Sequence, residues 1–469
     1  MCGNNTAGAA YFGAPAPALH FAEPVSNPVS CPAPCPVPSA VPSPVPSAVD
    51  PQLNATTRAL FTSLHQASGK FAMFGHQNET SNVIGVDTDS DVHAVTGTYP
   101  ALWGSDLSGV ERDATTNIDG FSMCDVRDEL LRAYNMGAMV TMSWHSANPI
   151  TLGGYGHNTA PGSVAAVLPG GERHEQFLEW LDRVASFLDS VVDGDSGESV
   201  PIVFRPFHEH TGDWFWWCTG SPARPTDTTP EQFIALWRMT VEYLRDVRGL
   251  HNLLYAYSPD RSRIDMSSEA TREAGYLYAY PGDDYVDVLG FDDYWDIAPA
   301  EGEAERPRER HDDLINMLSL VGRLAKERGK IAAATEVGSP GEFACRYAMS
   351  DGDIAALGRD YAGADDLTGV AGSAGAGAGS GFAGETGDAG EQSGTPADSP
   401  WTSYLLTAAL ANEDTRRVLW YMPWRNDPDA AGTGAYGTPV AGSRYAADFR
   451  RFVEHPFIRM ANTLPLLYG

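Results

Sequence analysis

The chain has 469 residues, 43% of them hydrophobic, which is enough to bury a large core in one large domain or in two to three ordinary ones. Its 61 acidic residues outnumber the 31 Lys and Arg residues, so the formal net charge is −30, and such a surface repels phosphate backbones and anionic lipid headgroups. We therefore expect no nucleic-acid partner and no membrane partner, and we expect a neutral substrate such as a sugar or a peptide.

The chain begins with a segment that predicts no packed structure. Residues 1–52 are rich in Pro, Ala, Ser and Val, a composition typical of an extended, disordered tail or linker. Cys31 and Cys35 in this tail lack a paired zinc-ligand pattern, so we expect free thiols or one incidental disulfide. No signal peptide is visible, which indicates a cytoplasmic location from this sequence alone and a secreted one if the true start differs. No apolar run is long enough to predict a transmembrane helix.

Eight apolar runs along the chain predict strands. They lack polar alternation, which is typical of strands buried on both faces of a parallel sheet. The predicted strands are residues 71–76, 101–106, 138–145, 201–209, 253–260, 286–294, 331–338 and 418–424.

Amphipathic helices are predicted between many of these strands. They cover residues 125–137, 174–192, 230–249, 311–329 and 401–414. Strands that alternate with helices predict an α/β fold, and eight of them predict a (β/α)8 TIM barrel formed by a single domain over residues 53–469. A Gly-, Ala- and Ser-rich stretch at 369–400 predicts a low-complexity insertion in a loop of that domain.

The alternative fold is a doubly wound open sheet, and the positions of the polar residues favour the barrel. A polar or aromatic residue ends each predicted strand, on the side where barrels carry their chemistry. These residues are His76, Asp106, His145, Glu209, Asp260, Tyr294, Glu336 and Trp424. No Rossmann glycine fingerprint and no phosphate-binding loop is present, so we expect no nucleotide and no other cofactor.

Two strand-end carboxylates, Glu209 and Glu336, are the candidate catalytic pair. Two Glu side chains on one apolar rim can cleave a glycosidic bond: one protonates the leaving oxygen, and the other attacks the anomeric carbon or activates water. The plain structural alternative for Glu209 is a salt bridge with Arg205, which strand alternation would place on the same face. Trp residues around the rim suit a sugar site, because flat rings stack on pyranose faces, although we expect at least half of them to be core.

A metal site is the competing interpretation of the motif "HEH". His208 and His210 have the spacing that would place two imidazoles on one face of a strand, and His76 and His145 could complete a ligand set. The motif stands on the fourth strand, however, and no HExxH helix accompanies it. We therefore predict no metal ligand. A serine nucleophile is not expected either, because no GxSxG motif occurs.

The string "PIVFRPFHEHTGDWFWW" at 201–217, together with "AAATEVG" at 332–338, resembles glycoside hydrolase family 26, the β-mannanase family of the clan A barrels. The resemblance covers about residues 55 to 465 and includes "FGHQ", "YPALWGSD", "VTMSWHSANP" and "PWRN". It implies a monomeric retaining endo-β-1,4-mannanase that acts on mannan, glucomannan or galactomannan. Cys218 departs from the pattern, because many members are expected to have Gly after "WFWW".

The resemblance also implies roles for individual residues. Glu336 would be the nucleophile and Glu209 the acid/base, while Tyr294 would hold the nucleophile. The other residues would bind sugar: His208 near subsite −1, Trp424 under the −1 sugar, Arg425 at −2, His145 on the glycone side and Trp214 at +1. Alternatives remain open: a family relative that cuts mixed-linkage β-glucan or β-1,3-xylan, a metal-dependent barrel hydrolase, or a barrel that only binds carbohydrate.

Overall fold

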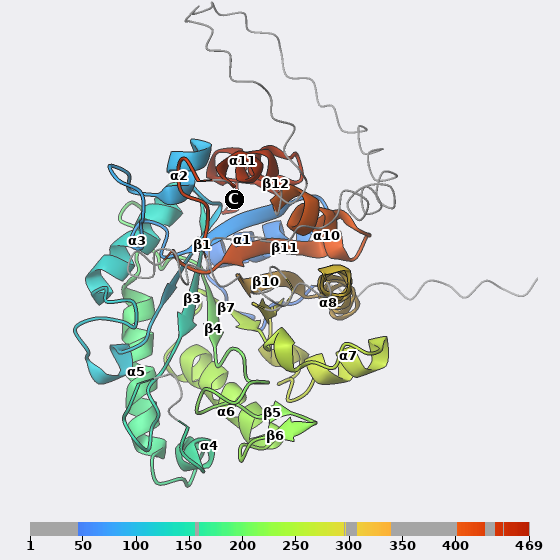
Figure 1. The fold of residues 1–469 in the computed structure, drawn as a ribbon. Helices are drawn as coiled ribbons and strands as arrows, with labels where there is room; N and C mark the ends of the chain where they lie inside the picture. The colour runs from blue at the N-terminus through green and yellow to red at the C-terminus, as the bar shows by residue number, and fades with distance from the viewer. Residues whose placement is uncertain are drawn as a thin grey trace, which may run out of the picture. The chain divides into compact units, whose positions relative to one another are not determined.

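The computed structural model describes residues 46–154, 159–294, 296, 307–338, 401–426, 437–443 and 445–468. Within these residues one sheet closes into a barrel in which all neighbouring strands run parallel, and β5 (Gly220–Ser221) and β6 (Arg224–Pro225) form a separate antiparallel pair (Figure 1). The barrel strands are β1 (Ala72–Gln77), β2 (Leu102–Asp106), β3 (Met139–Trp144), β4 (Ile202–Pro206), β7 (Leu253–Tyr257), β8 (Val288–Leu289) with its continuation β9 (Asp292–Asp293), β10 (Ile331–Val337) and β11 (Val418–Pro423). β11 pairs with both β10 and β1, which closes the sheet. The predicted (β/α)8 barrel is therefore confirmed.

Each predicted strand has its counterpart, but the fourth and the fifth end before the predicted residues 209 and 260, and the sixth is divided into β8 and β9. β4 ends at Pro206, although we had expected the strand to run to residue 209. Phe207 and Glu209 adopt positive φ angles of 50° and 54°, so the backbone turns away from the extended path directly after Pro206. As a result, the "HEH" motif lies on a turn above the barrel and not on a strand.

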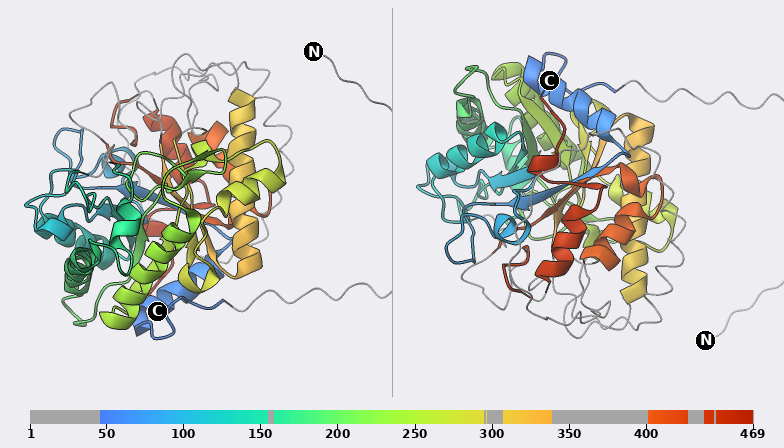
Figure 2. Two further views of the ribbon diagram at one scale, coloured as in Figure 1. Left: turned by 90° about the horizontal axis from the view of Figure 1, so that it is seen from below. Right: turned by 90° about the horizontal axis from the view of Figure 1, so that it is seen from above.

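Helices cover the outside of the barrel, as Figure 2 shows from two directions. They are α1 (Ala55–Ala67), α2 (Asp91–Thr96), α3 (Met123–Asn135), α4 (Ser163–Val167), α5 (His174–Ser190), α6 (Pro230–Glu242), α7 (Glu269–Tyr276), α8 (Pro307–Arg328), α10 (Thr407–Leu410) and α11 (Ala446–Glu454). The predictions of α3, α5, α6 and α8 are confirmed. The helix predicted at 401–414 is instead a π-helical turn (Trp401–Leu406) followed by α10. We did not predict α1, α2, α4, α7 or α11.

Local sequence explains where these helices begin and end. Thr229 and Gln232 form a capping box at the start of α6, and Pro230 occupies its first turn, where its missing N–H costs no hydrogen bond. Gly329 has a φ angle of 65° directly after α8, a conformation that glycine adopts without steric cost. None of the helices in the described ranges is long and apolar enough to cross a membrane.

Buried side chains form two layers, one inside the barrel and one between strands and helices. Met73, Leu102 and Val203 belong to the inner cluster, whereas their chain neighbours, such as Phe74, Trp103 and Phe204, belong to the outer one. Because successive side chains point to opposite faces of a strand, both faces need apolar residues. The uninterrupted apolar runs follow from this arrangement, and polar side chains are left for the strand ends.

The packed chain starts a little before the predicted boundary at residue 53. Val49 is buried and its N–H donates to Asp287 Oδ1 at 2.8 Å, and Asp50 Oδ2 lies 2.8 Å from His251 Nδ1. Residues 49–52, which we had assigned to the tail, thus contact the barrel. Residues 1–45 of the predicted tail and the predicted insertion at 369–400 lie outside the described residues.

Candidate active site

Glu336 lies at the carboxyl end of β10 and has two donors. The hydroxyl of Tyr294 donates to its Oε1 at 2.5 Å, and Arg205 Nη2 donates to its Oε2. The same guanidinium bonds Asp292 Oδ2 through Nη1 at 2.7 Å. Arg205 is fully buried, and the adjacent charges of Asp292 and Glu336 raise its pKa although burial alone lowers it. A permanent positive charge therefore lies beside Glu336, and its carboxylate is held in one orientation.

These contacts correct one expectation. Arg205 does not form the predicted salt bridge with Glu209; it pairs with Glu336 and Asp292. The alternation that would place Arg205 and Glu209 on one face applies only to extended backbone, and the chain leaves that conformation at Phe207. The structural alternative for Glu209 is therefore wrong.

Glu209 lies on the turn after β4, in surroundings unlike those of Glu336. Its backbone N–H donates to Ser258 O at 2.7 Å, and the indole N–H of Trp214 donates to its Oε2 at 2.6 Å. Burial raises the pKa of Glu209 well above its ordinary value, and the negative charges of Asp260, Glu336 and Asp292 raise it further. The hydrogen bond from Trp214 opposes this shift, and so does the charge of Arg205. Glu336 thus lies against a cation, whereas the surroundings of Glu209 favour its protonated form. A displacement assisted by an acid needs this combination of two carboxyl groups.

A chain of hydrogen bonds from Asp106 ends at His208. His145 Nδ1 lies 2.7 Å from Asp106 Oδ2, and His145 Nε2 lies 3.0 Å from His208 Nε2. Burial alone raises the pKa of Asp106, but His145 and the bonds from Ser143 and Ser108 lower it below its ordinary value. An ionised carboxylate only accepts, so His145 Nδ1 carries a proton. Burial lowers the pKa of His208 well below its usual range, so its ring is neutral, and its Nδ1 has no hydrogen-bond partner among the described residues.

Trp424 and Arg425 follow directly after β11. The Trp424 ring lies edge-on to His145, with 6.1 Å between ring centroids, and its indole is only partly buried. Arg425 Nε forms an ion pair with Asp119 Oδ1 at 2.5 Å. Trp214 is also partly buried, with the guanidinium of Arg263 5.4 Å from its ring centroid. The structure thus brings His145 next to His208 and Trp424, and Trp214 next to Glu209.

Most of the remaining tryptophans are core residues, as we expected. Trp103, Trp144, Trp217 and Trp420 are fully buried, whereas Trp295 lies outside the described residues. Partial exposure at the strand ends, and not the residue type alone, therefore separates Trp214 and Trp424 from the core tryptophans.

His210 points away from His208, contrary to the metal interpretation. Its Nδ1 lies 3.1 Å from Thr219 Oγ1 and its Nε2 lies 2.9 Å from Tyr257 OH, and burial lowers its pKa to about 3. The positive φ of Glu209 between the two histidines turns their side chains apart, so the expectation of one shared strand face is wrong. Across the described residues, no group of three or more His, Cys, Asp or Glu side chains could hold a metal ion.

Cys218 is a buried structural residue below the same turn. Its Sγ donates to the carbonyl oxygen of Glu209 at 3.4 Å, and burial raises the pKa of its thiol. The thiol therefore supports the turn that carries Glu209. This contact gives a structural role to Cys218, at the position where Gly was expected.

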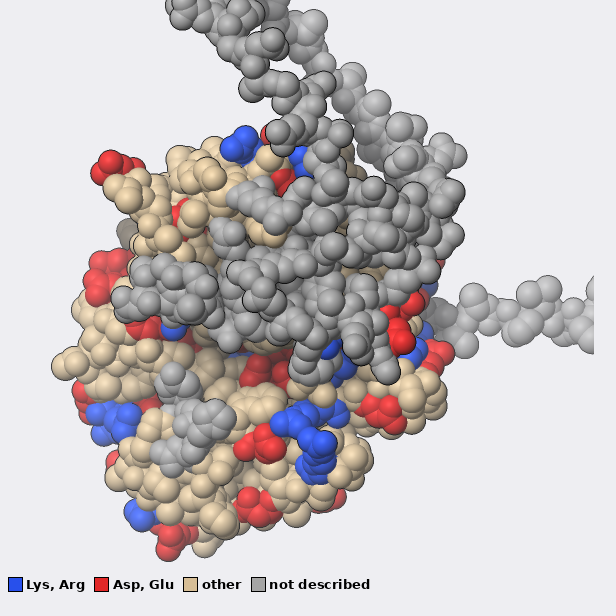
Figure 3. All heavy atoms as spheres, in the orientation of Figure 1, with Lys and Arg blue, Asp and Glu red and all other residues tan. Residues whose placement is uncertain are grey.

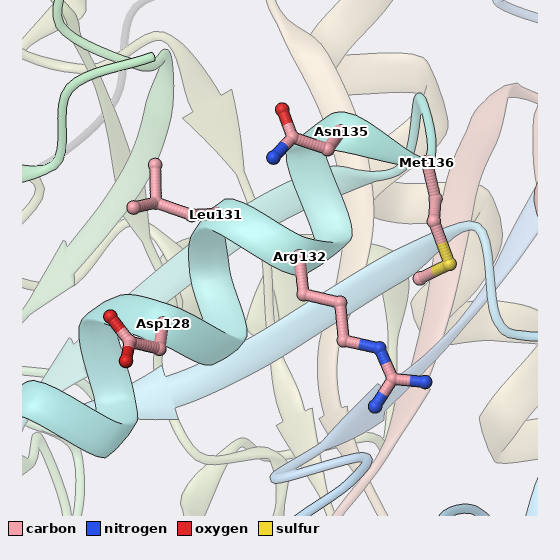
Figure 4. A pocket seen from close by; sticks show the side chains of 5 residues that line it. All are labelled: Asp128, Leu131, Arg132, Asn135 and Met136. Atoms are coloured by element: carbon pink, nitrogen blue, oxygen red, sulfur yellow. The ribbon is translucent and has the colours of Figure 1, made fainter. Parts of the chain in front are cut away.

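Several site residues were not assigned from the sequence. Asp292 stands two positions before Tyr294 on the same strand end, so the strand-end rule could have identified it. Asn78 and Asp119 lie on loops after β1 and β2, and no local pattern marks them. A separate surface pocket on α3, lined by Asp128, Leu131, Arg132, Asn135 and Met136 (Figure 4), contains none of the predicted site residues.

The charged side chains visible around the molecule have both signs. Figure 3 shows red acidic and blue basic groups side by side on the described surface of this face. Many charged side chains of the described residues form ion pairs, for example Arg328 with Asp283 at 3.1 Å and Arg263 with Asp213 at 3.1 Å.

The chain is similar to known glycosidases. The family model described as glycosyl hydrolase family 26 matches residues 49–345. A mannan endo-1,4-beta-mannosidase of Bifidobacterium adolescentis is 35% identical over 298 residues, which is 62% of this chain and 28% of that protein. A mannan endo-1,4-beta-mannosidase of Bacillus subtilis is 28% identical over 241 residues, 49% of this chain and 59% of that protein. The matches thus span about a quarter to three fifths of these curated relatives.

Solved structures resemble the chain over more of its length. A family 26 β-mannanase of Bacteroides ovatus has a TM-score of 0.67 at 32% identity, and the match covers 89% of this chain and 98% of that one. A modular endo-β-1,4-mannanase of Cellulomonas fimi has a TM-score of 0.67 at 28% identity, with 91% of this chain and 80% of that one covered.

Proposed function

The chain belongs to glycosyl hydrolase family 26, and on that basis we propose that it is a retaining endo-β-1,4-mannanase that hydrolyses mannan, glucomannan or galactomannan. The named relatives support this substrate, because mannan endo-1,4-beta-mannosidases and β-mannanase structures are among the proteins that it resembles. The proposal includes one catalytic domain, predicted over residues 53–469, to which the packed residues Val49 and Asp50 are added. That the protein acts as a monomer stays a prediction.

One observation carries the reaction: the two glutamates have opposite electrostatic surroundings. Glu336 faces the guanidinium of Arg205, whereas burial and three neighbouring carboxylates favour the protonated form of Glu209. A carboxylate beside a fixed cation is available as a nucleophile, and a carboxyl group that retains its proton is available as an acid.

In the first step a carboxylate oxygen of Glu336 attacks the anomeric carbon of the sugar in subsite −1. The bond between that carbon and the glycosidic oxygen breaks, and Glu209 gives its proton to the departing oxygen. The product is an ester between Glu336 and the sugar. The Tyr294 hydroxyl, 2.5 Å from Glu336 Oε1, orients the carboxylate that attacks.

In the second step the ionised Glu209 takes a proton from water as the water oxygen attacks the anomeric carbon. The ester bond breaks, Glu336 returns as a carboxylate and Glu209 is protonated again. Two displacements at one carbon retain its configuration. The Trp214 N–H stabilises the ionised form of Glu209 that this step requires.

The proposal gives the neighbouring residues sugar-binding roles. His145 and His208 contact the glycone near subsite −1, Trp424 stacks under the −1 sugar, and Arg425 binds at −2. Trp214 provides the aromatic wall at +1. The partial exposure of Trp424 and Trp214 supports these roles, since each leaves part of its ring available to a ligand.

The test has two parts. Glu336→Ala should lose about a thousandfold or more of kcat on mannan while remaining folded, because no other group can form the ester. The products from mannohexaose should be short oligosaccharides from internal cleavage, with the β-anomer formed first. Turnover near that of the wild type in Glu336→Ala, or first formation of the α-anomer, would overturn the mechanism. Initial rates on mannan, mixed-linkage β-glucan and β-1,3-xylan decide the substrate.

A further inference from the structure

Arg425 depends on a buried carboxylate from a different part of the barrel. Its Nε forms an ion pair with Asp119 Oδ1 at 2.5 Å, and the amide nitrogen of Asn78 donates to Asp119 Oδ2 at 2.7 Å. The Asp119 side chain is 1% exposed, whereas that of Arg425 is 23% exposed. The anion therefore lies beneath the surface, and the cation rests on it and reaches solvent.

The three residues come from loops that follow three adjacent strands. β11, β1 and β2 are neighbours in the barrel, and Arg425, Asn78 and Asp119 lie after them in that order. Asp119 is itself held in place, because its N–H donates to Asn117 Oδ1 at 3.0 Å and the Asn117 amide donates to the carbonyl oxygen of Asp106 at 3.2 Å. This network joins the loop of Arg425 to the strand end that orients His145.

The contacts of Asp119 fit a role in positioning Arg425. Burial and the charge of Asp106 raise the pKa of Asp119, whereas Arg425, the Asn78 amide and His145 oppose that shift. Burying a carboxylate costs free energy, and pairing it with a cation roughly offsets that cost. The ion pair of Asp119 therefore adds little to the free energy of unfolding. The ion pair does, however, restrict the four rotatable bonds of Arg425 before a ligand arrives, and this lowers the entropy cost of binding that ligand.

We propose that Asp119, supported by Asn78, is a positioning residue that sets the place of the Arg425 guanidinium for the second sugar on the glycone side. This inference rests on the proposed function. Asp119 acts through Arg425 and touches no sugar itself.

The test compares two aryl glycosides. 4-Nitrophenyl β-mannobioside fills subsites −2 and −1, whereas 4-nitrophenyl β-mannoside fills only −1, so the ratio of their kcat/KM values measures the contribution of −2. In Asp119→Asn this ratio should fall about tenfold, mainly through KM for the bioside, as expected when a hydrogen bond to a charged group is misplaced. Asp128→Asn on the exposed face of α3 is the matched control and should leave the ratio unchanged.

A double-mutant cycle separates positioning from general damage. Arg425→Ala should lower the ratio by at least as much as Asp119→Asn, and Asp119→Asn should then change it by less than twofold in the Arg425→Ala background. An unchanged ratio in the single variant, or an equal fall in both backgrounds, would overturn the proposal. If Asp119→Asn does not fold, Asn78→Ala removes the second support and should lower the ratio in the same direction.

The result can be distinguished from failure of the proposed function. If the wild type cleaves neither mannoside but cleaves β-glucan or β-1,3-xylan, the mannan proposal fails. The same ratio is then measured with the aryl bioside and monoside of the sugar that is cleaved, and the role of Asp119 stands or falls on that measurement.

Discussion

The indole N–H of Trp214 donates to Glu209 Oε2 at 2.6 Å. This bond favours the ionised form of Glu209, whereas burial and the charges of Asp260, Glu336 and Asp292 favour the protonated form. Trp214, which the family resemblance placed as an aromatic residue at subsite +1, therefore also orients the acid/base.

Replacing Trp214 by Phe should slow the second step most. The substitution keeps an aromatic ring but removes the donor, so the pKa of Glu209 rises further and its base form becomes scarcer. With an activated aryl mannoside, whose first step is fast, kcat should fall about tenfold or more, the usual effect of losing a hydrogen bond to a charged group. Arg263→Gln removes the cation 5.4 Å from the ring centroid and keeps the N–H, so it should cost much less. An equal loss in both variants would show that the hydrogen bond is not the cause.

Replacing Asp260 by Asn should move the alkaline limb of the pH–activity profile to lower pH. Glu209 must be protonated in the first step, so kcat/KM falls as pH rises through its pKa. Burial raises the pKa of Asp260 to about 6, so above that pH its negative charge raises the pKa of Glu209, and removing the charge lowers it. Asp246→Asn, at an exposed carboxylate paired with Arg245, is the control and should leave the limb in place. A limb that stays fixed in Asp260→Asn would contradict this electrostatic account.

Replacing Asp106 by Ala should destabilise the protein by about 3 kcal/mol at neutral pH, because the buried His145 ring, the Ser143 hydroxyl and the backbone N–H groups of Ser108 and His145 lose their acceptor. The pKa of Asp106 is lower in the folded protein than its ordinary value. Its contribution is therefore present above the unfolded pKa of about 3.9 and is lost as pH falls through the folded pKa. Urea unfolding across that range should show the variant and the wild type converging at acid pH. A difference that does not depend on pH would argue against an ionised Asp106.

Exhaustive chelation should leave activity unchanged, and elemental analysis should find no stoichiometric metal. His210→Ala should lower the free energy of unfolding by about 2 to 4 kcal/mol, because the hydroxyls of Thr219 and Tyr257 lose a buried partner. The variant should keep kcat/KM within a few fold of the wild type at temperatures where it is folded. Loss of activity on chelation, restored by one metal, would favour the metal-dependent hydrolase instead.

The sequence predicted the barrel and the position of Glu336 because both depend on local patterns. Buried parallel strands need apolar residues on both faces, so the eight runs were visible without any tertiary information. Glu336 interrupts such a run at its carboxyl end, and β10 extends through that residue. Several of the short motifs that carry the family resemblance, such as "FGHQ", "YPALWGSD" and "AAATEVG", also lie at the ends of strands.

The surroundings of each group could not be predicted in this way. The structural alternative paired Arg205 with Glu209, and the metal interpretation placed His210 on one strand face with His208. Both extended strand alternation past Pro206. The positive φ angles of Phe207 and Glu209 end that alternation, and neither residue type indicates such a conformation from sequence. Asp119 was missed because its partner Arg425 lies more than 300 residues further along the chain, and Asn78 was missed because its contact is with Asp119.

By itself, then, the sequence determined which residues form the strands, and hence which side chains stand at the rim of the barrel. Only the tertiary structure decided how those side chains are paired: Glu336 with Arg205 and Tyr294, Glu209 with Trp214, and Arg425 with Asp119. The physical reason is that secondary structure follows from periodicity along the chain, whereas the charge state and orientation of a buried group follow from neighbours that closure of the barrel brings together.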